Sequence, residues 1–166
     1  MHKSRLRRRR LCSGQLWYAL RKVNVAIHLA KPKLITPIIC SPEGFLLDGK
    51  GVLCHQGILT ITPQCSDLDI HYLLGLLNSD SLWRYISLRA ASMGKDRRVL
   101  RLQLAKALPV LVPENRKQRS LALAIARSVL SMQKARAPKK ALAITSRING
   151  LVDELYGVDA VCPRCH

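Results

Sequence analysis

Aromatic residues are scarce in this chain of 166 residues, which contains two Trp, four Tyr and one Phe. Acidic residues are scarce as well, with 10 Asp and Glu against 28 Lys and Arg, so the formal net charge is +18. Apolar residues still make up 48% of the sequence, which favours a globular chain over a disordered one. With so few aromatic rings, we expect a core built mainly from Leu, Ile, Val and Ala.

Long hydrophobic runs are also missing. The longest, such as residues 34–40, fall well short of the ~18 residues of a membrane-spanning helix and include Thr or Pro. The arginine run at 7–10 precedes only a short segment interrupted by polar residues, which does not make a secretory signal peptide. Six cysteines in such a basic chain predict free thiols rather than a disulfide framework, and with them a cytoplasmic protein.

The excess of positive charge predicts an anionic partner, because self-repulsion of this size opposes a compact, soluble chain. Polyphosphate backbones of nucleic acids are the obvious partner for such a chain. The first ten residues alone hold six cations. We therefore interpret residues 1–14 as a basic flexible arm.

The first part of the chain has several segments that favour β-strands, at residues 17–20, 34–40 and 57–62. Pro37 has no amide donor, so it predicts an edge strand or a bulge at 34–40. Residues 45–48 and 52–55 flank Gly49-Lys50-Gly51, whose glycines can adopt the positive φ of a tight turn. This pattern predicts a β-hairpin.

Helical periodicity begins near Leu68, with Ser66 or Asp67 as the expected N-cap. We expect this helical segment to end or kink around Asn78 and Ser79. Farther on, Leu108–Val112 is a β-compatible stretch between two prolines and predicts a short strand.

From Arg116 onward, apolar residues recur on one face of each of two helical segments, and Pro138 is placed at or just inside the start of the second. This predicts an antiparallel helical hairpin. No acid occurs between Glu114 and Asp153, so the outer face of the hairpin should be strongly basic.

The main candidate for contacting nucleic acid is one polar cluster. It lies in and just after the loop that follows the predicted long helix. Arginine offers a planar fork for guanine edges or phosphates, and glutamine can pair with adenine. The alternative is a basic loop that is merely solvated. The cluster consists of Lys95, Arg97, Arg98, Arg101, Gln103 and Lys106.

A second candidate surface consists of Lys50, His55 and Gln56 around the predicted hairpin, because a two-stranded ribbon fits the major groove. The alternative interpretation of these residues is an ordinary hairpin tip. Four aromatic side chains could stack on bases, but each lies in an apolar periodic context, which favours core packing. They are Trp17, Tyr18, Trp83 and Tyr85.

The terminal motif Cys162-Pro-Arg-Cys165-His166 has the spacing of a c-type haem attachment site and of half a zinc site. Haem attachment requires export, and a four-coordinate zinc would need further ligands. The other cysteines show no second Cys-x-x-Cys spacing. We therefore expect no metal site and a frayed C-terminus.

Six short segments between about Gln15 and Asp159 form an ordered set. Together they resemble the C-terminal specificity domain of TaqI-like adenine-specific DNA methyltransferases, which is related to the target-recognition domains of type I restriction specificity subunits. The segments are Trp17-Tyr-Ala-Leu-Arg, Lys31-Pro-Lys-Leu-Ile-Thr-Pro, Phe45-Leu-Leu-Asp, Asp69-Ile-His-Tyr-Leu-Leu-Gly-Leu-Leu-Asn-Ser, Leu108-Pro-Val and Glu154-Leu-Tyr-Gly-Val.

The resemblance implies that this chain binds DNA in a restriction-modification system. Complete members of the family methylate adenine with an Asn- or Asp-Pro-Pro-aromatic loop and a Gly-rich loop for S-adenosylmethionine, and this chain has neither. We therefore expect no catalytic residue, no cofactor and no enzymatic activity. Between Ala90 and Gln103 the chain is richer in Arg than the family, whose loop is richer in Gly and aromatics. The recognised DNA sequence therefore cannot be carried over.

These observations predict an α+β chain. Its target-recognition domain, residues 15–113, would contain a twisted, mostly antiparallel β-region and one long helix. An antiparallel helical hairpin at 114–158 and a disordered tail at 159–166 would follow. The expected partners are double-stranded DNA and a methyltransferase catalytic domain or subunit, with no membrane. The alternatives are a non-specific RNA- or ribosome-associated protein and a non-functional gene fragment.

Overall fold

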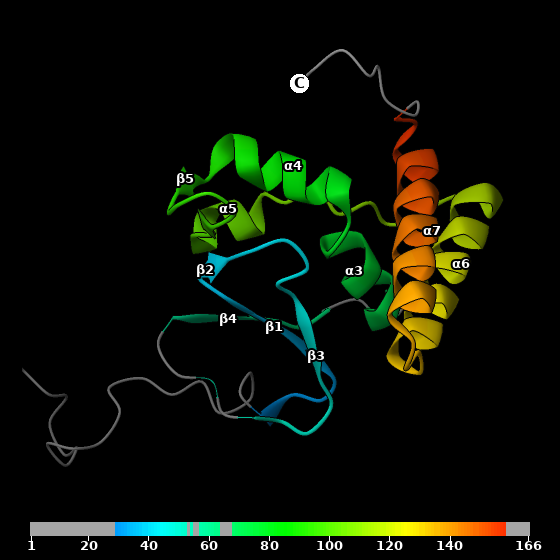
Figure 1. Cartoon of the computed structure of the whole chain (residues 1–166), viewed down its shortest axis with the longest axis horizontal. Helices are drawn as coiled ribbons and strands as arrows, with labels where there is room; N and C mark the ends of the chain where they lie inside the picture. The colour runs from blue at the N-terminus through cyan, green and yellow to red at the C-terminus, as the bar shows by residue number, and fades with distance from the viewer. Residues whose placement is uncertain (1–28, 53, 55–56, 64–67, 159–166) are drawn as a thin grey trace, which may run out of the picture.

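Three strands form the first of two small sheets. The computed structural model describes residues 29–52, 54, 57–63 and 68–158. In it, β1 (Lys33–Pro37) lies between β3 (Leu46–Asp48) and β4 (Ile58–Ile61), antiparallel to both (Figure 1). The strand predicted at 57–62 is thereby confirmed as β4.

Pro37 is the last residue of the central strand, so the prediction of an edge strand is wrong for β1 as a whole. The amide of Ile38 donates to the Gly57 carbonyl (2.7 Å), on the side of β4. Because successive backbone amides of a strand point to opposite sides, the nitrogen of Pro37 faces the side of β3. No pairing with β3 extends that far, because β3 pairs only with residues 33–35. The missing donor of Pro37 therefore costs no ladder hydrogen bond.

The second sheet has the order β2-β6-β5, all antiparallel. Its strands are β2 (Ile39–Cys40), β5 (Ala91–Ser92) and β6 (Arg98–Val99). The single strand predicted at 34–40 is therefore two strands, which belong to different sheets and are separated at Ile38.

The hairpin predicted between 45–48 and 52–55 is only partly covered by the structure, because residues 53 and 55 lie outside the described residues. Among the described ones, β3 pairs with β1, and residues 52 and 54 are not in a strand. The carboxylate of Asp48 accepts the amides of Lys50, Gly51 and Val52, which would otherwise be donors for a second strand. The turn therefore wraps around an acidic side chain.

The expected long helix consists of two helices, α3 (Ile70–Leu77) and α4 (Asp80–Arg89), and the break predicted around Asn78 and Ser79 is confirmed. Asp69 caps α3 by accepting the amides of His71 and Tyr72. The predicted caps Ser66 and Asp67 lie outside the described residues. Ser79 caps α4 by accepting the amide of Leu82.

The strand predicted at Leu108–Val112 is wrong. The chain forms the short helix α5 (Leu102–Lys106) and then an irregular segment through Pro113. The two prolines cannot donate to a strand ladder, and Val110 donates locally to Leu108 (2.8 Å).

The C-terminal helical hairpin is confirmed by α6 (Arg116–Gln133) and α7 (Pro138–Tyr156), which lie side by side in Figure 1. Asn115 and Gln118 form a capping box at the start of α6, and Pro138 occupies the first turn of α7. Gly157, with φ of 63°, ends α7 in the left-handed conformation.

One core joins the sheets to the helices. Gly75 of α3 lies directly against Ile125 and Val129 of α6, where a Cβ atom would come within 2.6 and 2.9 Å of their methyl carbons. Phe45 and Tyr72 are the only aromatic residues buried in the described part of the chain, so the core is aliphatic as expected. The α+β class predicted from the sequence is confirmed.

Candidate nucleic-acid interface

The predicted basic loop begins as a β-hairpin. Strands β5 and β6 pair antiparallel, and the amide of Met93 extends the ladder by donating to the Arg97 carbonyl (3.0 Å). Residues 94–96 form the tip, where Gly94 has a φ of 111° that L side chains rarely adopt. Sequence reasoning missed these strands, because each contains only two residues.

Arg97 and Arg98 lie on opposite faces of this hairpin, because successive side chains of a strand alternate. Arg97 shares its face with Met93 and Val99, and its side chain is exposed. Arg98 lies on the other face, directly opposite Ser92.

One nitrogen of the Arg98 guanidinium is bonded within the hairpin. Its Nη1 donates to the carbonyl of Arg97 (2.9 Å), to the carbonyl of Gly94 (3.4 Å) and to the hydroxyl of Ser92 (3.4 Å). These bonds hold the tip against β6. In the described part of the chain, the Arg97 side chain has no such contact and is open to a partner.

The base of the hairpin is fixed to the rest of the fold. Leu100 is fully buried, and its amide donates to the Ile38 carbonyl (2.7 Å). Cys40 is also fully buried on the neighbouring strand β2, where burial raises the pKa of its thiol. The hairpin therefore extends from a rigid attachment.

The remaining members of the basic cluster follow directly along the chain. Arg101 is the N-cap of α5, and both Gln103 and Lys106 are exposed on that helix. Figure 1 shows β5 and α5 together at one end of the molecule, so the structure brings these residues to the same region as the hairpin. The exposed Lys95 lies at the hairpin tip.

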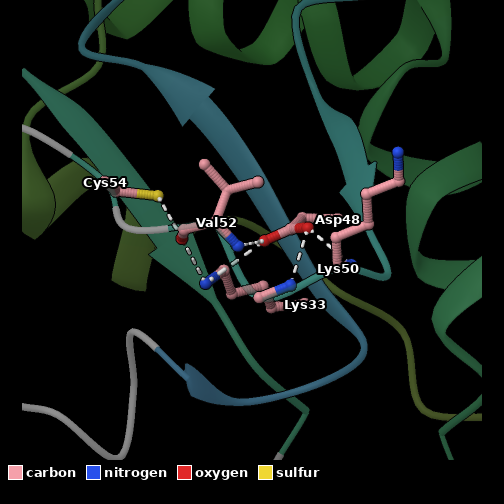
Figure 2. A network of polar contacts seen from close by, with 6 residues as sticks. Lys33, Asp48, Lys50, Val52 and Cys54 are labelled. Atoms are coloured by element: carbon pink, nitrogen blue, oxygen red, sulfur yellow. Dashed lines mark hydrogen bonds and ion pairs between the residues drawn. The ribbon is translucent and has the colours of Figure 1, made fainter.

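The second candidate surface is not part of this region. Lys50 lies in the turn after β3, which Figure 1 places well away from β5 and α5. Figure 2 shows its side chain pointing away from the polar network around Asp48. His55 and Gln56 lie outside the described residues, so a shared surface of these two residues with Lys50 stays a prediction.

Three tyrosine hydroxyls donate hydrogen bonds to the irregular segment that follows α5. Tyr72 donates to the Leu111 carbonyl (2.7 Å), Tyr85 donates to the Ala107 carbonyl (3.1 Å), and Tyr156 donates to the Pro109 carbonyl. Burial raises the pKa of both Tyr72 and Tyr156, so both remain protonated donors at neutral pH. Alternate carbonyls of the segment are thus fixed by α3, α4 and α7.

The predicted role of two aromatic residues in packing agrees with this arrangement. Trp83 and Tyr85 are partly buried against the core. The ring of Tyr85 also lies under the guanidinium of Arg89, 4.3 Å from its centroid. Trp17 and Tyr18 lie outside the described residues.

A buried ion pair joins β1 to β3, and sequence reasoning missed it. Lys33 is fully buried, and its Nζ lies 3.2 Å from Asp48 Oδ2 and 2.7 Å from the Val52 carbonyl (Figure 2). Burial acts to raise the pKa of Asp48, but the hydrogen bonds from Lys50, Val52, Lys33 and Gly51 outweigh it and hold that pKa below its ordinary value.

The described residues contain no cluster of three or more His, Cys, Asp or Glu side chains that could hold a metal ion. The terminal motif at Cys162, Cys165 and His166 lies outside them. Within the same part of the chain, no helix is both long enough and apolar enough to cross a membrane.

The sequence was compared with protein-family models and with curated proteins, and neither comparison finds a match.

Proposed function

We propose that this chain binds double-stranded DNA in a sequence-specific manner, as the target-recognition part of an adenine-specific restriction-modification methyltransferase. The observation that carries the proposal is the rigidly attached β5–β6 hairpin with an exposed, unpaired Arg97 on one face. Between Asp80 and Glu114 the chain has seven Lys and Arg and one acid, Asp96. Such a surface attracts a phosphate backbone.

In this mechanism, phosphate contacts fix the orientation and a few side chains read base edges. Lys95, Arg101 and Lys106 are the candidates for the phosphate contacts. Arg97 reads a guanine edge from the hairpin, because a two-stranded ribbon fits the major groove and Arg binds guanine through two hydrogen bonds. Gln103, which is exposed on α5, pairs with an adenine in this mechanism.

Two of the segments that carry the family resemblance, Lys31–Pro37 and Phe45–Asp48, contain the adjacent antiparallel strands β1 and β3, which the buried ion pair of Lys33 and Asp48 joins. The proposal assigns methyl transfer to a separate catalytic domain or subunit, because this sequence has neither the catalytic nor the cofactor motif of the family.

Binding of a labelled duplex across a salt series tests this function. The logarithm of the binding constant should fall linearly with the logarithm of salt concentration, by about 0.9 per neutralised phosphate. Arg97→Ala should abolish preference among duplexes, whereas Arg136→Ala, which removes the same charge from the turn between α6 and α7, should leave that preference intact. Equal competition by unrelated duplex and by RNA would instead favour a general polyanion-binding protein.

A further inference from the structure

A small polar hollow lies between α6 and α7, on the helical hairpin rather than near β5 and α5. Its volume is about 170 Å³, and Arg127 of α6 and Arg147 of α7 both line it. The hydroxyls of Ser128 and Ser131 also line it, but each donates to a carbonyl of its own helix. The two arginines are therefore the donors available to a ligand in the hollow.

Arg127 and Arg147 line one hollow, and no acidic residue lines it with them. No Asp or Glu occurs between Glu114 and Asp153, and Glu154 forms an ion pair with Lys117 (3.0 Å). Within the described part of the chain, neither Arg127 nor Arg147 has an acidic partner. Two like charges in this position repel each other, and an anion between them removes that repulsion.

The positive charge continues along both helices. Lys134 lies seven residues after Arg127, and Lys140 lies seven residues before Arg147, so each lysine lies on the same side of its helix as the arginine. Seven residues span about 10 Å of helix. Both lysines are exposed, so the hollow is part of an extended positive track rather than a socket for one ion.

We propose that this track binds successive backbone phosphates of a polynucleotide, with Arg127 and Arg147 clamping one phosphate in the hollow. Arginine suits this role because its fork matches two phosphate oxygens. The site goes beyond the function proposed above, since the track lies on α6 and α7 and Figure 1 shows these helices at the opposite end of the molecule from β5.

The test uses the full chain, a labelled 15-bp duplex and fluorescence anisotropy across a salt series. Arg127→Gln with Arg147→Gln should reduce the salt slope by about 0.9, because the contact with the one clamped phosphate is lost. The matched control, Lys50→Gln with Arg119→Gln, removes the same charge from exposed positions away from the track and should change the slope little. Equal losses in the two double variants would overturn the site, because bulk charge would then explain both.

Two further arms separate the alternatives. Inorganic phosphate should displace the duplex no better than chloride at equal ionic strength, and stronger displacement would show that the hollow takes a free anion instead. Arg97→Ala distinguishes this site from the proposed recognition function, because it should remove the preference among duplexes and leave the salt slope nearly unchanged. An unchanged slope in the Arg127 and Arg147 variant would overturn the track, whereas an unchanged preference in Arg97→Ala would overturn the hairpin and leave the track standing.

Discussion

At the scale of single residues, the two neighbouring arginines of the β5–β6 hairpin differ in what they contact. Arg98 is tied to three acceptors within the hairpin, while Arg97 projects from the other face. Identical side chains next to each other in sequence therefore have different roles. Arg98 positions the tip, and Arg97 is available for recognition.

Arg98→Ala should speed hydrogen exchange of the Met93 amide, because the bonds that hold the tip are lost, and should weaken binding to all duplexes alike. Arg97→Ala should leave that exchange unchanged and cost ~1 to 3 kcal/mol on the preferred duplex alone. Exchange measured by NMR and affinity measured by anisotropy check the two effects. If Arg97→Ala sped the exchange and Arg98→Ala weakened binding to the preferred duplex alone, Arg98 would be the residue that reads the base.

The buried pair of Lys33 and Asp48 predicts a specific dependence of stability on pH. Because the pKa of Asp48 is held below its ordinary value of 3.8, its contribution is present above that pH and is lost as pH falls through the lowered value. Asp48→Asn should lower the melting temperature by several degrees at pH 7, because Lys33 loses its carboxylate partner.

Melting curves of the wild type and Asp48→Asn between pH 7 and pH 3 check this prediction. The difference in melting temperature between the two proteins should narrow once the pH falls below about 4. The exposed Asp96→Asn is the matched control, and its melting temperature should stay close to that of the wild type at every pH. A difference for Asp48→Asn that stays constant to low pH would contradict a charged Asp48 in the folded state.

At the scale of elements, the contact of α3 with α6 depends on a residue without a side chain. A Cβ atom at Gly75 would meet methyl carbons of Ile125 and Val129, whereas one at Gly150 on α7 would meet nothing within 4 Å. Both glycines lie inside helices, so alanine gains helix propensity equally at each. The difference between the two substitutions therefore measures the packing of α3.

Gly150→Ala should raise the free energy of unfolding by about 0.5 to 1 kcal/mol. Gly75→Ala should lower it by about 0.5 to 2 kcal/mol, because the cost of overpacking exceeds the gain in propensity. Urea denaturation checks both values. If Gly75→Ala were as stabilising as Gly150→Ala, the close approach of α3 and α6 would be wrong.

Local signals predicted α3, α4, α6 and α7, but not the short helix α5. The apolar spacing around Ile125 and Ile148, and the capping residues at Asn78 and Ser79, depend on neighbours within a few positions. Strand pairing depends on distant partners, so the sequence could not show that Asp48 pairs with Lys33. The aliphatic segment at 108–112 is typical of a strand, but tyrosines of α3 and α7 bind its carbonyls at Leu111 and Pro109.

The candidate interface could be predicted only in part. Charge and residue type indicated the cluster from Lys95 to Lys106. Sequence alone could not distinguish Arg97 from Arg98, because their roles depend on the register of two-residue strands and on the acceptors near the tip. The turn at Lys50 surrounds the carboxylate of Asp48, which the sequence alone could not show, and the contact of the Lys50 side chain with DNA stays a prediction.

At the scale of the whole molecule, positive charge is carried by two separate regions of one fold. The β5–β6 hairpin and α5 lie at one end, and the helical hairpin of α6 and α7 lies at the other. The first has exposed residue types suited to reading bases, and the second has an extended row of cations. This arrangement suits recognition at one end and backbone attraction at the other.

The most direct test of the central claim is selection of bound duplexes from a pool of random sequence, with the wild type and Arg97→Ala in parallel at moderate salt. The wild type should enrich a short motif that contains a guanine, and Arg97→Ala should lose the preference at that guanine while still retaining duplexes. Selection by the wild type that yields no motif, or the same motif from both proteins, would contradict sequence reading by the β5–β6 hairpin.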